Sequence, residues 1–305
     1  MKQKILVILG PTASGKSALA VKLAKKLNGE VISADSRQVY KGLDIGTGKI
    51  PRREMRGVPH HLLDVASPKK HFSAGDFVKL ARRKIKTIYH TGKLPIVVGG
   101  TGYYIDALAG RVILPNVAPD MRLRARLQKK TALQLYALLK KRDPKRAHAM
   151  SSKSERNNKV RLIRALEIAK YQGRSSVKLP RTVLGNTSSY DVLWLGINPP
   201  LKTLEKKIAV RLFARMRGGM VAEARKLHGA GLSYKRMEEL GLEYRSLARF
   251  LQKKISKSEM ETVLRRDILR YAKKQMSYWK RNKDIKWFRP TGSKKIARAI
   301  QTWLR

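Results

Sequence analysis

Short apolar runs alternate with segments of helical periodicity over the first 113 residues. The runs KILVIL (4–9), EVISAD (30–35) and PIVVGG (95–100) are long enough for buried strands. Between them, leucines recur at four-residue spacing at Leu19, Leu23 and Leu27, and a second helical pattern covers about 77–89. Alternation of strand and helix predicts a parallel sheet covered by helices.

The pattern changes after this region. Residues 122–186 contain leucine-rich helical segments and no convincing strand, whereas DVLWLGIN (191–198) predicts one more core strand, followed by helices to the end of the chain. We therefore expect three segments. They are residues 1–118, the first part of an α/β core; residues 119–187, a basic all-helical insertion domain; and residues 188–305, a continuation of the core with a basic helical C-terminal region.

The net charge of the chain indicates a class of binding partner. The 305 residues include 69 Lys and Arg but 21 Asp and Glu, giving a formal net charge of +48. Residues 122–186 alone hold 19 basic side chains and three acidic ones. A folded surface of this kind attracts polyanions, so nucleic acid is the first partner to consider, and an anionic membrane the second. A compositional bias of the source organism would explain the charge without any partner.

Cysteine usage and hydropathy exclude several classes of protein. The chain has no cysteine, which excludes disulfides, cysteine-ligated zinc and a cysteine nucleophile. The apolar run at the N-terminus is five residues long and ends at Gly10-Pro11, too short for a secretory signal. No run approaches the roughly 20 apolar residues that span a bilayer, so we expect a cytoplasmic protein without a membrane partner.

A phosphate-binding motif follows the first predicted strand. Residues 10–17, GPTASGKS, match G-x-x-x-x-G-K-[ST] between a strand and a helix, the context that the P-loop mechanism requires. Backbone N–H groups and the helix N-terminus then face an anion, the lysine adds charge, and the serine hydroxyl can bind Mg²⁺. We expect a P-loop-containing α/β sheet whose phosphate site consists of Gly10, Pro11, Thr12, Ala13, Ser14, Gly15, Lys16 and Ser17.

One acidic residue stands at the end of the second predicted strand. Asp35 follows EVISA, and in an open parallel sheet the carboxyl ends of the strands form the ligand crevice. A carboxylate there can take a proton from a nucleophile; its alternatives are a helix N-cap or an outer ligand of Mg²⁺. By contrast, the strand PIVVGG ends in glycines, so it lacks the acid that an ordinary P-loop NTPase places there.

Several longer strings resemble one family, the tRNA dimethylallyltransferases, also called tRNA isopentenyltransferases. The resemblance covers about residues 4–290. Beside the P-loop, it is carried by DSRQVYKGLDIGTGK (35–49), PHHLLD (59–64), SAGDF (73–77), PIVVGGTGYYIDAL (95–108), RLIRALEIAKYQG (161–173), Arg211, ELGLEYR (239–245) and YAKKQMSYWKRNKDIKWF (271–288).

The resemblance implies transfer of a dimethylallyl group from dimethylallyl diphosphate to N6 of the adenosine at position 37, 3′ of the tRNA anticodon. The P-loop would then hold an allylic diphosphate and Mg²⁺, with Ser17 as metal ligand, and the partner would be the anticodon stem-loop bound by a monomer. The catalytic residues implied are Asp35 as acceptor of the N6 proton, Thr101 as adenosine contact and Arg211 as diphosphate clamp. The tRNA contacts implied are Asp35, Ser36, Arg37, Gln38, Thr101, Arg122, Lys159, Val160, Arg161, Leu162 and Ile163.

Two features depart from the family pattern. Phe213 stands where the family usually has an acid two residues after the clamp arginine, which leaves the anchoring of Arg211 open. The family string I-G-Y-K-E is here Leu-Gly-Leu-Glu-Tyr (240–244).

Two other clusters invite a functional interpretation. Adjacent histidines, His60 and His61, point to opposite sides of an extended chain, which favours a structural role over a shared metal ion. Aromatic residues between basic ones near Trp279 suit either base stacking or packing under a helix.

Three other functions share parts of this pattern. A P-loop kinase of a small molecule, or an enzyme that prenylates free adenine nucleotides, would use the P-loop and Asp35 but leaves the charge of residues 122–186 unexplained. An RNA-binding protein without activity explains the charge but not the P-loop.

Overall fold

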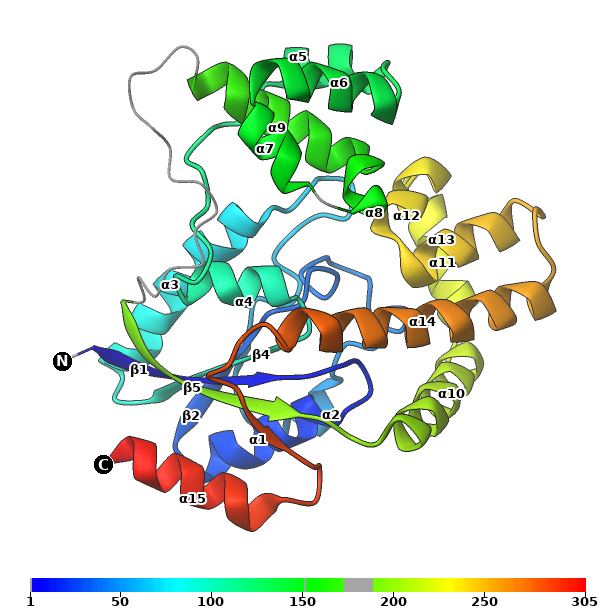
Figure 1. Ribbon diagram of the computed structural model, residues 1–305. Coiled ribbons are helices and arrows are strands. Elements are labelled where there is room, and N and C mark those ends of the chain that lie inside the picture. The colour runs from blue at the N-terminus through cyan, green and yellow to red at the C-terminus, as the bar shows by residue number, and fades with distance from the viewer. Residues whose placement is uncertain (1, 151, 173–188) are drawn as a thin grey trace. The chain divides into compact units, whose positions relative to one another are not determined.

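The computed structural model describes residues 2–150, 152–172 and 189–305, which form two compact units. The first unit comprises residues 1–112 and 186–305 and is built on a six-stranded, all-parallel sheet of order β3-β2-β4-β1-β5-β6 (Figure 1). The strands are β1 (Gln3–Leu9), β2 (Gly29–Ser33), β3 (His60–His61), β4 (Leu94–Gly99), β5 (Tyr190–Ile197) and β6 (Lys286–Phe288).

Alternate residues of the central strands face opposite helical layers. In β1, Ile5, Val7 and Leu9 pack in one cluster and Leu6 and Ile8 in another. The first cluster contains side chains of α3 (Ala74–His90) and α4 (Gly102–Leu108), and the second contains side chains of α1 (Lys16–Lys26) and α15 (Ser293–Leu304). Burial on both faces explains why these strands are continuously apolar, and confirms the expected α/β fold with a helix-covered parallel sheet.

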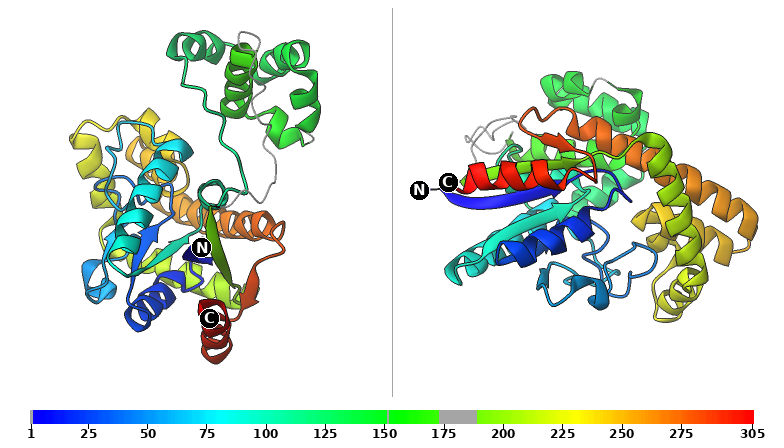
Figure 2. Two further views of the ribbon diagram at one scale, coloured as in Figure 1. Left: turned by 90° about the vertical axis from the view of Figure 1, so that its left-hand side faces the viewer. Right: turned by 90° about the horizontal axis from the view of Figure 1, so that it is seen from below.

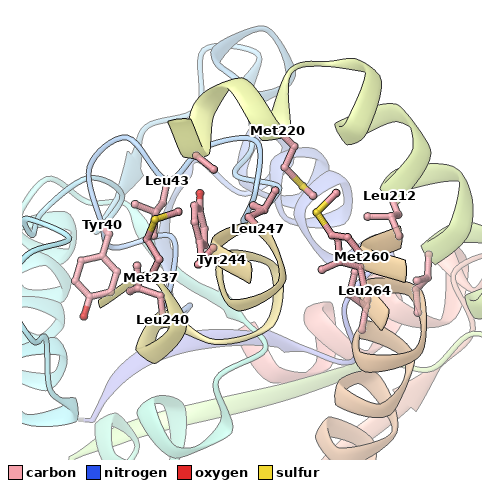
Figure 3. Close-up of a cluster of buried hydrophobic side chains, with 14 of the residues drawn as sticks. Tyr40, Leu43, Leu212, Met220, Met237, Leu240, Tyr244, Leu247, Met260 and Leu264 are labelled. Carbon is pink, nitrogen blue, oxygen red and sulfur yellow. The ribbon is translucent and has the colours of Figure 1, made fainter. Parts of the chain in front are cut away.

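Five further helices gather near one end of the sheet, as the view from below shows (Figure 2). They are α10 (Leu201–Arg217), α11 (Met220–Gly229), α12 (Tyr234–Leu240), α13 (Leu242–Leu251) and the long α14 (Lys257–Trp279). Their apolar faces share a core with residues 39–43, in which Leu43, Met220, Met237, Tyr244 and Leu247 lie together (Figure 3). This core fixes the helices that carry Arg211 and the string ELGLEYR.

The second unit comprises residues 113–185, and all the regular secondary structure of its described part is helical. Its own core contains Leu123, Leu135, Leu139, Leu162 and Leu166. Glu167, buried there, accepts hydrogen bonds from Arg124 and Arg164, which balance its charge. The helices are α5 (Met121–Gln128), α6 (Ala132–Arg142), α7 (Pro144–Ala149), α8 (Lys153–Arg156) and α9 (Lys159–Gln172).

The observed boundaries differ in detail from the expected ones. The first unit ends at residue 112 instead of 118, because residues 113–118 belong with the helical unit. The other expected boundary, at 187/188, lies outside the described residues. The expectation of helices only after residue 198 is wrong for Lys286–Phe288, which forms the edge strand β6 beside β5. The structure also adds α2 (Arg52–Met55) and the short β3. Among the described residues, no helix is long and apolar enough to cross a membrane.

Candidate functional site

The site lies where the chain leaves the carboxyl ends of neighbouring strands. β1 leads into the P-loop, β2 into Asp35 and β4 into Thr101. The connection that follows β1 runs to one side of the sheet, and the connection that follows β4 runs to the other. Where the connections of two neighbouring parallel strands diverge in this way, a crevice opens at the carboxyl ends of the strands. A cavity of about 390 Å³ occupies it, lined among others by Lys16, Ser17, Asp35 and Arg211.

The P-loop adopts the backbone conformation that its glycines permit. Gly10 has φ 145° and Gly15 has φ 92°, values that side chains with a Cβ rarely adopt. Gly15 is the N-cap of α1, and no atom lies within 4 Å of where its Cβ would stand. Ser14 Oγ is buried without a hydrogen-bond partner in the described part of the chain. Space above Gly15, free N–H groups at the start of α1 and this unused hydroxyl fit an anion such as a phosphate.

Lys16 is the cation of this cradle, and its charge is weakened by its surroundings. Burial and, less strongly, the nearby positive charge of Arg211 lower its pKa to about 8, against the attraction of Asp35. Its Nζ donates a hydrogen bond of 2.6 Å to the carbonyl of Pro11, within its own loop. A bound diphosphate would supply the negative charge that a buried ammonium group needs.

Asp35 and Thr101 are held close to one another by the backbone. Oδ1 of Asp35 accepts hydrogen bonds from the N–H groups of Arg37 at 2.8 Å and Gln38 at 3.3 Å, while no described residue donates to Oδ2. Oγ1 of Thr101 accepts from the N–H of Ser36 at 2.9 Å. The two side chains therefore meet at residues 35–38, with one carboxylate oxygen left for a ligand.

The clamp arginine is anchored by a route that the sequence did not reveal. Phe213 is 64% exposed and contacts Arg217, so it does not support Arg211. Instead, Arg211 lies against Gly48, whose Cβ, if present, would stand 2.9 Å from Nη2 of the arginine. Burial and the charge of Arg215 lower the pKa of Arg211, whereas Glu54 and Glu243 favour its charged form.

Glu223 on α11 holds the loop that seats Arg211. Its carboxylate accepts hydrogen bonds from the N–H groups of residues 44, 45 and 46, at 2.9, 2.7 and 2.9 Å. The carboxylate also accepts a hydrogen bond of 2.6 Å from the hydroxyl of Tyr244. Tyr244 lies in the apolar core that Figure 3 shows. Arg215 Nη1 donates to the carbonyl of Gly46 at 2.7 Å and so joins the same loop. Glu223 is 177 residues away from Gly46, which explains why the sequence alone did not single it out.

A glutamine on α14 also lies among the site residues. Gln275 lines the cavity, and its amide contacts both the P-loop and the segment before Thr101. It lies inside the string YAKKQMSYWKR, of which the sequence interpretation used only the basic and aromatic members.

The expected tRNA contacts divide between the two units. Ser36, Arg37 and Gln38 line the cavity. In the helical unit Arg122, Val160 and Arg161 are exposed, and Lys159 donates to the carbonyl of Gln128. Leu162 and Ile163 differ, because helical periodicity turns both inward and they are buried in the core of that unit. Their side chains support exposed neighbours, and a tRNA contact at these two positions stays a prediction.

The histidines and aromatic residues have structural partners. His60 Nδ1 contacts the carbonyl of Val58, whereas His61 Nε2 contacts the carboxylate of Glu30, so each ring has a different partner. Within the described part of the chain, no group of three His, Cys, Asp or Glu side chains could hold a metal ion. Trp279 is fully buried, whereas Tyr278 is half-buried, donates to Asp106 and has the guanidinium of Arg281 over its ring.

Comparisons with known proteins show that the chain is similar to one family. The IPP transferase family model matches residues 38–282. The chain is 38% identical to the tRNA dimethylallyltransferase of Carboxydothermus hydrogenoformans, over 94% of this chain and 92% of that protein. It is 41% identical to the tRNA dimethylallyltransferase 2 of Citrifermentans bemidjiense, over 91% and 86% of the two chains.

Solved structures show the same similarity in three dimensions. The tRNA isopentenylpyrophosphate transferase of Bacillus halodurans superposes with a TM-score of 0.72 at 35% identity, covering 99% of this chain and 98% of that one. A eukaryotic dimethylallyltransferase described as acting on tRNA has a TM-score of 0.76 at 25% identity, covering 96% and 75%.

Proposed function

The chain belongs to the IPP transferase family and is an enzyme that transfers a prenyl group to tRNA, and from this premise we propose its donor, its acceptor atom and its catalytic residues. The donor is dimethylallyl diphosphate, and the acceptor is N6 of the adenosine at position 37 of tRNA. One observation carries this proposal: the P-loop, Asp35 and Arg211 come from distant parts of the chain and line one cavity, and Thr101 accepts a hydrogen bond from Ser36, which lines it too.

The reaction is a substitution at the allylic carbon. The N6 amine forms a bond to C1 of the dimethylallyl group, and the bond between C1 and the diphosphate oxygen breaks. Diphosphate leaves with the electron pair, and the cations of Lys16 and Arg211 stabilise its negative charge. The proton released from N6 passes to Oδ2 of Asp35, the oxygen that no described residue uses.

Thr101 and the neighbouring backbone position the weakly nucleophilic amine. An adenosine that has left the stack of a single-stranded loop can enter the cavity at low cost. Holding its N6 next to both Asp35 and the allylic carbon replaces a collision of two free molecules with a step inside one complex. Arg37 and Gln38, which also line the cavity, are placed to contact the same nucleotide.

Magnesium is part of the proposal. The hydroxyl of Ser17 lines the cavity and is an oxygen donor of the type that Mg²⁺ prefers. Because the described residues offer no group of three His, Cys, Asp or Glu side chains, Ser17 would hold the ion together with water and diphosphate oxygens. When bound, Mg²⁺ neutralises charge on the leaving diphosphate.

The surroundings of the reaction follow from the same premise. The proposed reaction uses residues of one chain and needs none from a second copy, so a monomeric enzyme is part of the proposal, and the tRNA substrate supports work in the cytoplasm. The kinase alternative is not favoured: β4 ends in Gly99 and Gly100, without the acid of an ordinary P-loop NTPase.

The proposal is tested with labelled donors. Incubation with radiolabelled dimethylallyl diphosphate and bulk tRNA should place the label on tRNA and release one diphosphate for each transfer. ATP labelled in its γ-phosphate should donate no label to tRNA or to small nucleosides. Phosphoryl transfer from ATP, or label that stays in dimethylallyl diphosphate, would contradict the proposal.

A further inference from the structure

Gln275 links two loops of the site through one side-chain amide. Its Oε1 accepts a hydrogen bond of 2.8 Å from the N–H of Thr12, and its Nε2 donates one of 3.0 Å to the carbonyl of Gly100. The side chain is only 6% exposed. It stands on the 23-residue helix α14, one turn before the fully buried Trp279, and so on a rigid support.

The two partners fix both the residue type and the orientation of the amide. A backbone N–H can only donate and a carbonyl can only accept, so Oε1 must face Thr12 and Nε2 must face Gly100. Among side chains of this length, only glutamine offers an acceptor and a donor side by side without charge. The contact is close, since a Cβ at Gly100 would collide with Nε2.

The linked loops hold the two reactants of the proposed reaction. Thr12 belongs to the P-loop, which follows β1, and Gly100 immediately precedes Thr101, which follows β4. β1 and β4 pair in parallel up to Leu9 and Gly99, where the sheet register ends. Beyond these residues, the bridge of Gln275 determines how far apart the two loops stand.

We propose that Gln275 is a positioning residue that sets the distance between the allylic carbon above the P-loop and the amine held at Thr101. This inference rests on the proposed function and adds to it a residue that touches the loops without taking part in proton or prenyl transfer. A displacement of about 1 Å between bound reactants costs about 10²-fold in rate, whereas each loop keeps its own ligand contacts.

The first test is Gln275→Met, which keeps the length of the side chain and removes both hydrogen bonds. We expect the single-turnover rate, with both substrates saturating and active sites titrated, to fall about 10²-fold. Dissociation constants for dimethylallyl diphosphate and tRNA should each change less than about threefold, well below the loss in rate. The matched control is Gln252→Met, because the amide of Gln252, the C-cap of α13, bonds only to local groups: it donates to the carbonyl of Ala248 and accepts from the exposed Lys254.

The second test is a double-mutant cycle with Gly100→Ala. Gly100 does not have a left-handed φ, so alanine fits its backbone and acts by pushing the amide away. Gly100→Ala alone should slow turnover, while adding it to Gln275→Ala should cost little more, because the collision is gone. Rate losses that multiply would overturn the inference.

Two further results would also overturn it: a saturated rate of Gln275→Met within about threefold of the parent, or a lower melting temperature with an unchanged rate per active site. Failure of the parent protein to prenylate tRNA would contradict the proposed function instead, so the two failures are distinguishable.

Discussion

Lys16 and Asp35 divide the chemistry of the site between two residues only 19 positions apart in the chain. Burial lowers the pKa of the lysine to about 8, so that it is still mostly protonated at pH 7 and can attract an anion. The aspartate keeps one oxygen on backbone N–H groups and the other on the ligand side. The proposed mechanism therefore assigns charge neutralisation and proton removal to separate side chains, and single substitutions should separate them.

The pKa of Lys16 predicts how diphosphate affinity depends on pH. The lowered pKa means that the free protein loses this charge as the pH rises through about 8, and an anion prefers the protonated lysine. Affinity for dimethylallyl diphosphate should fall by up to about tenfold for each pH unit above 8. In Lys16→Met, affinity at pH 7 should be about 10- to 100-fold weaker and nearly flat with pH, while tRNA affinity is unchanged. Calorimetric titrations from pH 7 to 9.5 check this prediction. It would be contradicted if the affinity of the parent protein for dimethylallyl diphosphate depended on pH as little as that of the variant.

Asp35→Asn should separate binding from turnover. Asparagine keeps an oxygen for the N–H groups of Arg37 and Gln38 but cannot take a proton at neutral pH. Both substrates should bind nearly as in the parent, while the single-turnover rate falls about 10²- to 10⁴-fold. Asp284→Asn, which removes a surface partner of Arg111, is the control and should keep full rate. Near-parent turnover of the Asp35 variant would remove this residue from the base role.

Among the elements, loop 43–50 and helix α11 act as one support for the clamp arginine. Glu223 gathers three N–H groups of the loop, and the loop in turn seats Arg211 at Gly48. Arg215 closes the arrangement from α10 by contacting both Gly46 and Glu243. We therefore expect this loop and the negative charges of Glu54 and Glu243 to supply the anchoring that the family pattern gives to an acid at position 213.

The substitution Glu223→Gln should loosen this support. The amide has one acceptor instead of two and presents N–H groups to backbone donors, so the KM for dimethylallyl diphosphate should rise about tenfold or more. tRNA affinity should not change, because the loop serves the phosphate side. Tyr244→Phe removes one donor and leaves the three backbone bonds, so its effect should be smaller. Steady-state kinetics check both variants, and an equal loss of tRNA affinity in Glu223→Gln would argue against this role.

The exposed cations of α5 and α9 should govern the salt dependence of tRNA binding. Arg122→Ala, Lys159→Ala and Arg161→Ala together should weaken binding and make the plot of log affinity against log salt shallower, by about 0.7 to 0.9 for each phosphate that the variant no longer neutralises. The matched control replaces three exposed cations of α15, Lys294, Lys295 and Arg298, and should leave the slope nearly unchanged. Equal slopes in both triple variants would assign the charge to composition alone.

For the whole molecule, the sequence predicted what depends on local pattern. Apolar runs identified the four long strands, and GPTASGKS identified the phosphate site, because each signal lies within a few neighbouring residues. The strands β3 and β6, two and three residues long, are too short for an alternation to be visible. Gln275 was missed because its partner Thr12 is 263 residues away, and a bond across that distance leaves no local signal.

The net charge of +48 also acts at the scale of the whole molecule. Such a field raises the rate of encounter with tRNA before any specific contact forms, and its effect declines as salt is added. Specific chemistry then depends on the cavity of the first unit, where the phosphate cradle and Asp35 meet.

The central claim is most directly tested with two unmodified tRNAs that differ only in having adenosine or guanosine at position 37. After incubation with dimethylallyl diphosphate and Mg²⁺, the nucleosides of each tRNA are separated by chromatography and identified by mass spectrometry. The account predicts N6-(dimethylallyl)adenosine, at that one position, in the adenosine tRNA and no prenylated nucleoside in the guanosine tRNA. Prenylation of both tRNAs, or of neither, would contradict it.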